Sequence, residues 1–484
     1  MKSRRTPMLY MLLPLLCGVV ASTHLECAEW LSLLFIIPST VVLFVALRRW
    51  AIYPLIVGVG MFVGSLNRVT HTPSMSYDHQ YLLLVGDSRT AQVVAHRGCE
   101  SESWQRCRFE VTTSGCSIEE HSAILCRATL SLYDRHGLQS NTYITSMCRR
   151  GYVANLSIDS YVELDPVQLS RHLPLSVRMN RWAVERLGRL ELSDRAFASA
   201  AAMALAHRSQ LDEGLKESYR LSGTSHILAL SGLHFGVVLL IISSVTYLMP
   251  MVRNGHIVAD VVSIIFIWLF ACLVGMGESV LRAAWMFSML HLASLISRRS
   301  NSLNSLLAAS TLIILFDPAA LFDVGFQLSF VSVLSIIVVG APLAVRLFGR
   351  LLSPIKAVAS SIVIGVVVTL ATAPLLAYYF GGVSLIGPLA TLPTLVTLMV
   401  VLFSSIIWII APLNIVAPIA RALIECCTTL QNGIVERVAS WSWVYYDLQI
   451  SQLDMILAYL FMVTILLFVR VATSPSSRND YPKR

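Results

Sequence analysis

The chain has 484 residues, of which 56% are hydrophobic and only 13% are charged. A soluble domain carries about 25% charged residues, so the composition excludes a soluble enzyme, a disordered protein and a disulfide-stapled miniprotein. The mean hydropathy of +0.69 arises from repeated apolar runs close to the length that crosses a bilayer. We therefore predict a polytopic α-helical membrane protein with about 10–11 spans.

The first 66 residues are predicted to form three transmembrane spans. The apolar run 8–22 follows three basic residues and is interpreted as an uncleaved span, with a secretory signal peptide cleaved near 20–22 as the alternative. The next runs are 31–47 and 51–66. Basic residues mark cytoplasmic loops, so Arg48 and Arg49 place their connection inside, and the chain leaves the third span on the outer side.

Residues 67–170 are predicted to form an extracytoplasmic β-domain inserted after the third span. Strands are expected at 81–85, 90–95, 108–113, 124–133, 143–147 and 152–156. Turn sequences rich in Gly, Asp and Ser separate these segments. Five or six strands in about ninety residues fit a small OB-like Greek-key barrel, and a small sandwich fits nearly as well.

Half of the ten cysteines fall in this predicted domain: Cys99, Cys107, Cys116, Cys126 and Cys148. Clustered thiols in an extracytoplasmic domain predict disulfides. A zinc site is the competing interpretation, but closely spaced Cys and His pairs are lacking. Cys126 and Cys148 are equally far from Gly137, so a hairpin that turns there would place them opposite each other. The odd number leaves at least one thiol unpaired or bonded outside the segment.

The rest of the chain divides into three parts. Residues 171–222 are predicted to form amphipathic helices on the membrane surface, 223–470 a transmembrane domain, and 471–484 a polar tail. Spans are expected at 226–248, 257–275, 280–297, 303–316, 325–341, 358–380, 385–411 and 454–470. Connections that carry basic residues alternate with connections that carry acidic residues, as the positive-inside rule requires for loops on alternate sides of the membrane. Residues 412–445 are left open as a half-crossing or a partly lining helix, and the side of the carboxyl terminus is open with them.

Polar groups at membrane depth are costly and therefore candidates for function. The first cluster, 221–236, contains His226, Ser231, Gly232 and His234. The two histidines are eight residues apart, so on one helix they would share a face with Ser231 between them. The alternative is a kinked, glycine-packed helix whose histidines bond neighbouring carbonyls.

Three further clusters follow. Glu278 and Arg282 stand at i,i+4 and are predicted to pair within one helix, as a structural or a functional ion pair. Asp317 and Asp323 are expected to cap helices on either side of a tight outer turn, and Gln327 to point into the next span. The fourth cluster, 371–384, is a proline-kinked span that ends in aromatic residues and glycines.

These clusters resemble the motifs of the ComEC-type DNA-uptake competence proteins. The matching segments are 223–234, 277–283, 317–329 and 374–384, in the family's order. The layout is also similar, because the family places an outer OB-like domain after its first spans. Thr391 departs from the pattern, since an asparagine is expected there, and this puts a pore-lining role at that position in doubt.

The resemblance implies a multi-pass inner (plasma) membrane channel that carries single-stranded DNA into the cytoplasm during natural transformation. It assigns to the channel core His226, Ser231, Gly232, His234, Glu278, Arg282, Asp317, Asp323 and Gln327. Implied partners are single-stranded DNA, the lipid bilayer, a periplasmic DNA receptor, a cytoplasmic ATP-driven motor or single-strand-binding proteins, and a separate nuclease. Energy is expected from partners, because the phosphate-binding pattern GxxxxGK[ST] is absent from the sequence.

We expect no catalytic residue, metal or cofactor. Many family members carry a metallo-β-lactamase-like domain, and this chain is expected to be a short form without it, because no His-x-His-x-Asp-His cluster appears in the sequence. Candidate DNA contacts in the outer domain are Arg106, Arg108, Arg127, Trp104 and Phe109. They fit a basic groove with stacking aromatics, although an ordinary solvated surface explains the arginines equally well.

Three other functions remain open from the sequence. A transporter of another solute would be favoured by inverted repeats among the spans. An intramembrane enzyme would use Ser231 or His234 as nucleophile or base, and would need a third group to orient them. The third possibility is a structural protein of an envelope complex. The net charge of +8 suits binding of a polyanion. Much of the positive charge falls in predicted cytoplasmic loops, so the net charge does not distinguish between these functions.

Overall fold

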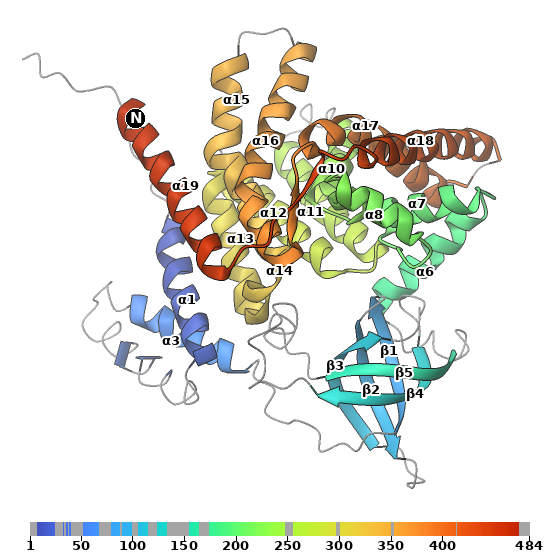
Figure 1. Cartoon of the computed structure of the whole chain (residues 1–484), viewed down its shortest axis with the longest axis horizontal. Helices are drawn as coiled ribbons and strands as arrows, with labels where there is room; N and C mark the ends of the chain where they lie inside the picture. Colours follow the sequence, from blue (N-terminus) through green and yellow to red (C-terminus); the bar gives the residue numbers. More distant parts are fainter. Residues whose placement is uncertain are drawn as a thin grey trace, which may run out of the picture.

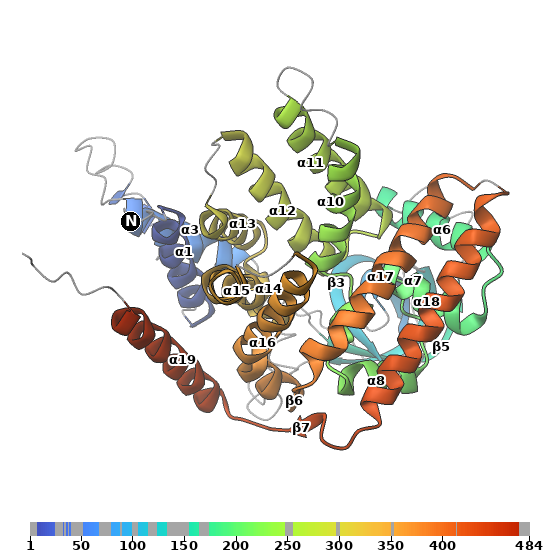
Figure 2. The ribbon, with the colours of Figure 1, turned by 90° about the horizontal axis from the view of Figure 1, so that it is seen from above.

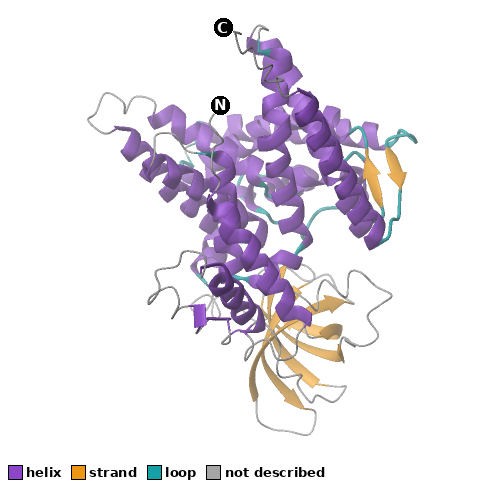
Figure 3. Ribbon diagram, turned by 90° about the vertical axis from the view of Figure 1, so that its left-hand side faces the viewer, coloured by secondary structure: helices purple, strands orange, loops and turns teal. Residues whose placement is uncertain are grey.

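The computed structural model describes residues 7–24, 32, 35–36, 38–39, 52–66, 79–87, 90–98, 105–114, 123–132, 154–163, 174–246, 255–296, 301–349, 353–412 and 414–473. Helices make up most of this part of the chain, and a separate group of strands lies at one end of them (Figures 1 and 3). The predicted span 31–47 and the predicted strand 143–147 lie almost wholly or wholly outside the described residues.

Two apolar helices begin the described structure, α1 (Pro7–His24) and α3 (Ile52–Leu66). They pack against each other through small residues, because a Cβ on Gly18 would lie 2.2 Å from the carbonyl oxygen of Val57. Such close backbone contact is typical of helix pairs in membranes. The amide of Met8 donates to Asn304 Oδ1 over 3.1 Å, so the start of α1 lies beside the start of α13 (Ser302–Phe316).

Five strands form a closed barrel in the order β1-β2-β3-β5-β4. They are β1 (His79–Asp87), β2 (Thr90–Gly98), β3 (Gln105–Ser114), β4 (Ala123–Leu132) and β5 (Ala154–Glu163). All neighbours are antiparallel except β3 and β5, which are parallel. Alternate residues such as Tyr81, Leu83 and Val93 fill the barrel core, as the period-two pattern of the sequence requires. The last strand continues well beyond the predicted segment 152–156.

The prediction that a hairpin turning at Gly137 would place Cys126 opposite Cys148 is wrong, because β4 pairs with β5 in a different register. In the ladder between β4 and β5, Cys126 stands opposite Tyr161, and Leu132 stands opposite Ala154, so the connection is not centred on Gly137. The side chain of Cys126 is buried in the barrel core. Cys148, Cys99 and Cys116, and the side chain of Cys107, lie outside the described residues, so disulfide formation remains a prediction.

The predicted surface helices are α6 (Leu175–Gly188), α7 (Asp194–Leu205) and α8 (Glu213–Leu221). For α6 and α8 the amphipathic pattern agrees with the structure, since each buries one face only. For α7 the prediction of a surface helix is wrong, because nearly the whole alanine-rich helix is buried against α6, α17 (Gly387–Ile410) and α18 (Val416–Ala439). Small side chains on all faces allow these neighbours to surround it.

The transmembrane domain follows. Its first elements are α9 (Ser225–Leu228), α10 (Gly232–Thr246), α11 (Gly255–Leu273), α12 (Glu278–Ile296), α13 and the 3₁₀ turn η4 (Pro318–Phe322). Then come α14 (Val324–Ser335), a π-turn η5 (Ile336–Gly340), α15 (Ala341–Phe348) and α16 (Ser353–Phe380). The chain ends in β6 (Gly382–Ser384), α17, α18, β7 (Tyr445–Asp447) and α19 (Gln452–Thr473).

Among the described residues, four helices are long and apolar enough to cross a membrane: Glu278–Ile296, Val324–Phe348, Ile355–Phe380 and Gly387–Ile410. Several apolar helices of the same domain are shorter, among them Ile257–Leu273 and Ser302–Phe316. Together these helices fit a polytopic helical membrane protein. They reproduce most of the predicted spans between 257 and 411, with boundaries shifted by a few residues.

Residues 382–447 form a helical hairpin whose base is a two-stranded sheet. After α16 the chain forms β6, α17, α18 and β7 in turn. Because β7 pairs with β6, the chain returns to the end of α16. α17 and α18 are seen side-on in Figure 2, whereas α14 and α15 are seen almost end-on, so the hairpin lies across their direction. The segment 412–445 is therefore mainly one complete amphipathic helix, α18, packed on α17.

The hairpin also fixes the direction of the last helix. Leu448 donates its amide to the carbonyl of Gly381, and Tyr459 donates its hydroxyl to the carbonyl of Ala371. α19 therefore runs antiparallel to α16, and the first half of α19 contacts the second half of α16. The far end of α19 points away from the barrel. In Figure 1 this end is at the top and the barrel is at the bottom.

Candidate functional site

The first motif, 223–234, contains a break rather than a continuous helix. Helix α9 ends at Leu228, Ala229 is extended, and α10 starts at Gly232. The predicted shared helix face for His226 and His234 is therefore wrong. His226 is exposed, whereas His234 is completely buried.

Ser231 and His234 lie together at the start of α10. The Ser231 amide donates to His234 Nδ1 over 3.1 Å, the Ser231 hydroxyl lies 3.3 Å from the same nitrogen, and the Leu233 amide donates to Ser231 Oγ. Because Nδ1 accepts, the neutral ring carries its proton on Nε2. His234 Nε2 is buried, and no described residue forms a hydrogen bond with it.

The first motif contacts the second at the start of α12. The Ser279 hydroxyl donates to the carbonyl of Leu230 over 2.7 Å, which satisfies a backbone oxygen released by the break. Gly232 adds a close contact with Phe287, and Phe235 stacks on the same ring at a centroid separation of 6.3 Å. Glu278 begins α12, where the helix dipole favours a carboxylate.

The second motif contacts the third through an ion pair. Arg282 Nη1 lies 2.8 Å from Asp323 Oδ2, and both side chains are only 11% exposed. Asp323 Oδ2 also accepts the amide of Phe326 as the N-cap of α14. A Cβ on Gly325 would lie 2.5 Å from Arg282 Nη2, so a side chain at this position would force the guanidinium to shift. Arg282 thus takes part in an interhelical ion pair, and its predicted pairing with Glu278 within α12 stays a prediction.

The third motif contacts the fourth through Gln327. Its Nε2 donates to the carbonyl of Leu321, and its Oε1 accepts the hydroxyl of Tyr379 over 3.1 Å. Asp317 Oδ1 accepts the amide of Ala319 and caps η4. The prediction that Asp317 and Asp323 cap helices on either side of a tight turn is confirmed.

The fourth motif contacts the first at Gly223. This residue has φ of +74°, a conformation that glycine adopts without strain, and a Cβ there would lie 2.9 Å from the Cβ and Oγ of Ser384 and 3.1 Å from the Cα of Gly387. The turn after α8 therefore packs directly on the end of β6.

Four motifs spread over 160 residues thus contact one another in a closed circuit, which we name the motif ring. It is defined by the contacts Leu230–Ser279, Arg282–Asp323, Gln327–Tyr379 and Gly223–Ser384. The contacts lie near the ends where α12 and α14 begin and α16 ends, in the break between α9 and α10, and in the turn after α8 beside β6. In Figure 1 these ends are on the barrel side of the helices.

A second set of polar contacts, which the sequence analysis missed, joins α7 and α8 to the helical hairpin. The Tyr219 hydroxyl donates to Asn432 Oδ1 over 3.0 Å, and Asn432 Nδ2 donates to Ser199 Oγ over 2.9 Å. The Thr397 hydroxyl donates to Gln431 Oε1 over 2.7 Å. All five side chains are buried, and burial raises the pKa of the Tyr219 phenol. We name these contacts the hairpin network.

One signal for the hairpin network was present in the sequence. Thr391, Thr394 and Thr397 repeat every three residues, which puts a polar stripe on one side of an otherwise apolar helix. Thr391 itself donates to the carbonyl of Gly387, so its hydroxyl is satisfied within α17. The partners across from this stripe are single residues far along the chain, and no local pattern marks them.

The candidate DNA contacts are only partly described. Arg127 is exposed on β4, while Trp104 and the side chains of Arg106, Arg108 and Phe109 lie outside the described residues. Within the part of the chain that the structure describes, no three His, Cys, Asp or Glu side chains are arranged to hold a metal ion.

Comparison with known proteins agrees with the motif ring. A family model described as "Competence protein" matches residues 203–473, more than half of the chain. ComE operon protein 3 of Bacillus subtilis (strain 168) is 28% identical over 186 residues, which is 38% of this chain and 23% of that relative. The match thus spans less than a quarter of the relative's length, and no solved structure matches. The matched region contains every residue of the motif ring, and the chain belongs to the Competence protein family.

Proposed function

We propose that this chain is an inner-membrane channel that passes single-stranded DNA into the cytoplasm during natural transformation. The motif ring is the observation that carries the proposal. It joins family motifs from separate helices, and its charged pair of Arg282 and Asp323 is largely shielded from water among apolar helices, where charged residues are candidates for function. We assign His226, His234 and Glu278 to the channel core because these residues lie in or next to the motif ring.

We further propose that the outer barrel is of the OB type and receives the strand. The strand order β1-β2-β3-β5-β4, closed by a parallel pair of β3 and β5, supports this assignment. OB barrels bind single strands with basic grooves and stacking aromatics. Arg127 is exposed on β4 and would contact a phosphate group of the strand in this proposal.

In this proposal the chain is a conduit rather than an enzyme. A periplasmic receptor delivers DNA, a cytoplasmic ATP-driven motor or single-strand-binding proteins draw it inward, and a separate nuclease degrades the other strand. The bilayer is the inner membrane, with the barrel outside. The proposal assigns delivery of DNA, its inward movement and degradation of the other strand to these partners, and it assigns none of these tasks to the motif ring or the barrel.

The test is uptake of labelled linear DNA by a deletion strain of the source organism. We expect the deletion to abolish transformation while DNA still binds to the cell surface, and Arg282→Ala to fail in complementation. Arg178→Ala is the matched control, because Arg178 is exposed on α6 outside the motif ring. Normal transformation in the deletion strain would contradict the proposal.

A second candidate function is an intramembrane enzyme, because Ser231 Oγ lies 3.3 Å from His234 Nδ1. Nucleophilic catalysis needs a third group that orients the base, and among the described residues His234 Nε2 has no hydrogen-bond partner. Ser231→Ala separates the two functions. Intact uptake in this variant excludes both an enzyme that uses Ser231 and gating by its hydroxyl.

A further inference from the structure

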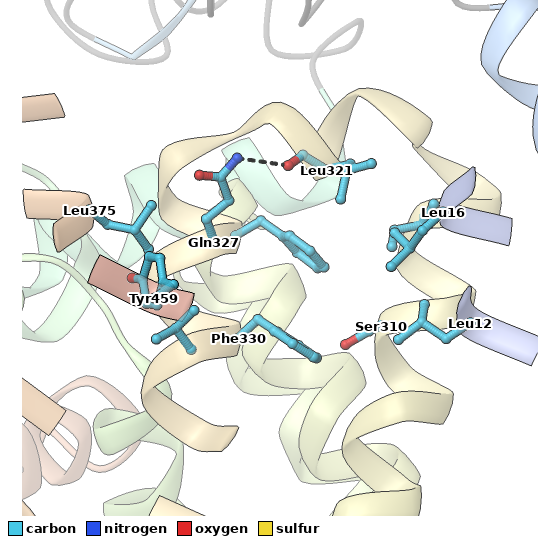
Figure 4. Close-up of a pocket in the computed structure, with 11 residues that line it drawn as sticks. Leu12, Leu16, Ser310, Leu321, Gln327, Phe330, Leu375 and Tyr459 are labelled. Carbon is cyan, nitrogen blue, oxygen red and sulfur yellow. Dashed lines mark hydrogen bonds between the residues drawn. The ribbon is translucent and has the colours of Figure 1, made fainter. Parts of the chain in front are cut away.

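An apolar cavity opens between the first and last helices of the described chain. Its volume is about 230 Å³, and its walls come from α1, α13, η4, α14, α16 and α19 (Figure 4). The floor is formed by Phe326 and Phe330 of α14, and Leu12 and Leu16 of α1 face it from one side. Engineered cavities of about 150 Å³ with such linings stay dry and bind benzene, so this one has room for a larger apolar ligand.

The few polar side chains in the wall have their hydrogen bonds satisfied by the protein. Gln327 bonds Leu321 and Tyr379, Tyr459 donates to the carbonyl of Ala371, and Ser310 donates to the carbonyl of Leu306. None of these side chains requires a hydrogen bond from a ligand. The cavity therefore selects for a ligand without polar groups at the inserted end, and water is disfavoured there.

The opening of the cavity continues into the apolar outer surface of the helix bundle. On α1, Leu12 faces the cavity while its neighbour Leu13 is 53% exposed. On α19, Tyr459 lines the cavity while Leu457 and Phe461 are exposed, the latter at 67%. In a membrane these outward faces contact lipid chains, so hydrocarbon is the medium at the entrance.

We propose that this cavity binds one acyl chain of a phospholipid from the surrounding bilayer. The chain would lie between α1 and α19, against Phe330 and Leu375. Gln327 of the third motif and Leu375 of the fourth motif both line the cavity. The bound lipid therefore stabilises the contact between these two motifs. The proposal rests on the membrane-embedded fold and makes no use of DNA transport.

The experiment uses the full chain in nanodiscs of phosphatidylethanolamine and phosphatidylglycerol, with a photoreactive diazirine in the acyl chain of the former. After irradiation, peptides of α1, α14 and α19 that contain cavity-lining residues are expected to carry the label. Native mass spectrometry of the detergent-extracted protein is expected to show one phospholipid retained after bulk lipid has been removed.

Leu12→Trp fills the cavity, and Leu13→Trp adds the same bulk on the outward face as the matched control. The retained phospholipid is expected to be lost in the first variant and kept in the second. If Leu12→Trp does not fold, Val331→Phe fills the cavity from α14. Equal retention in filled and control variants, labels confined to outward-facing peptides, or crosslinks to a second protein copy would each overturn the proposal. DNA uptake is measured separately, so a failed lipid result leaves the channel proposal untouched.

Discussion

The motif ring and the hairpin network both join distant segments by polar contacts, but they do so with different chemistry. The ring includes a charged pair, Arg282 with Asp323, placed at helix ends. The network uses only neutral side chains, such as Tyr219 and Asn432, buried between helices. Breaking a charged pair leaves an unpaired ion, whereas breaking a neutral contact leaves one unsatisfied dipole. The ring is thus the more sensitive to single substitutions.

The largest effect is expected for Arg282→Ala. Removing one partner of a buried ion pair leaves the Asp323 carboxylate uncompensated, and such losses cost about 3–5 kcal/mol. The measurement is thermal unfolding in detergent micelles, with exposed Arg178→Ala as control. Adding Asp323→Ala to Arg282→Ala should recover part of the loss. If the double variant is as unstable as the sum of the two single variants, the pair contributes no coupling.

A smaller loss is expected for Gly223→Ala. The φ of +74° strains an L-residue by about 1–2 kcal/mol, and the new Cβ would press on Ser384. The first and fourth motifs should then move apart at this contact. We therefore measure protease protection of the turn between α8 and α9. Gly236→Ala is the matched control, because a Cβ on Gly236 meets no atom within 4 Å. Unchanged protection in Gly223→Ala would show that this contact does not hold the ring.

The hairpin network is expected to respond less. Tyr219→Phe removes a hydroxyl and leaves Asn432 Oδ1 buried without its donor, which costs about 1–2 kcal/mol. The readout is hydrogen exchange in α18, where amides near Asn432 should exchange faster. Tyr446→Phe, on the exposed side of β7, is the matched control. Equal exchange in both variants would mean that α18 is held by its apolar contacts alone.

The smallest effect concerns acid. The Arg220 guanidinium bonds Glu217 and lowers the pKa of that carboxyl, while Arg220 also bonds Tyr445 of β7. A lowered folded-state pKa stabilises the fold above the ordinary glutamate pKa of about 4.3, and this contribution is lost as the pH falls below it. Because both side chains are about half exposed, we expect less than about 1 kcal/mol. Glu217→Gln should flatten this part of the stability curve on acid titration, and an unchanged curve would contradict the assignment.

The sequence was informative wherever a signal was local. Caps at Asp317 and Asp323, alternating strands such as 124–133, and the apolar spans all depend on neighbours along the chain, and the structure agrees with them. Asp323, which pairs with Arg282, lies 41 residues away, so the local i,i+4 spacing that pointed to Glu278 could not reveal this contact. The break between His226 and His234 was foreshadowed by Gly232, but a glycine in an apolar run does not specify whether a helix bends or ends.

Packing decided the remaining differences. The alanines of α7 carry too little amphipathic pattern to distinguish a surface helix from a buried one, and only the surrounding helices determine the outcome. Tyr219 and Asn432 are 213 residues apart, and neither residue type is diagnostic by itself. The sequence therefore identified all four segments of the ring by their motifs, but not which of their side chains contact one another.

The two-stranded sheet at the base of the helical hairpin has a mechanical consequence. Because β6 and β7 are paired, the end of α16 and the segment that leads into α19 are held together at the base of the hairpin. Ser384, the last residue of β6, also packs against Gly223. The same short strand therefore joins the hairpin, α16 and the turn that opens the first motif.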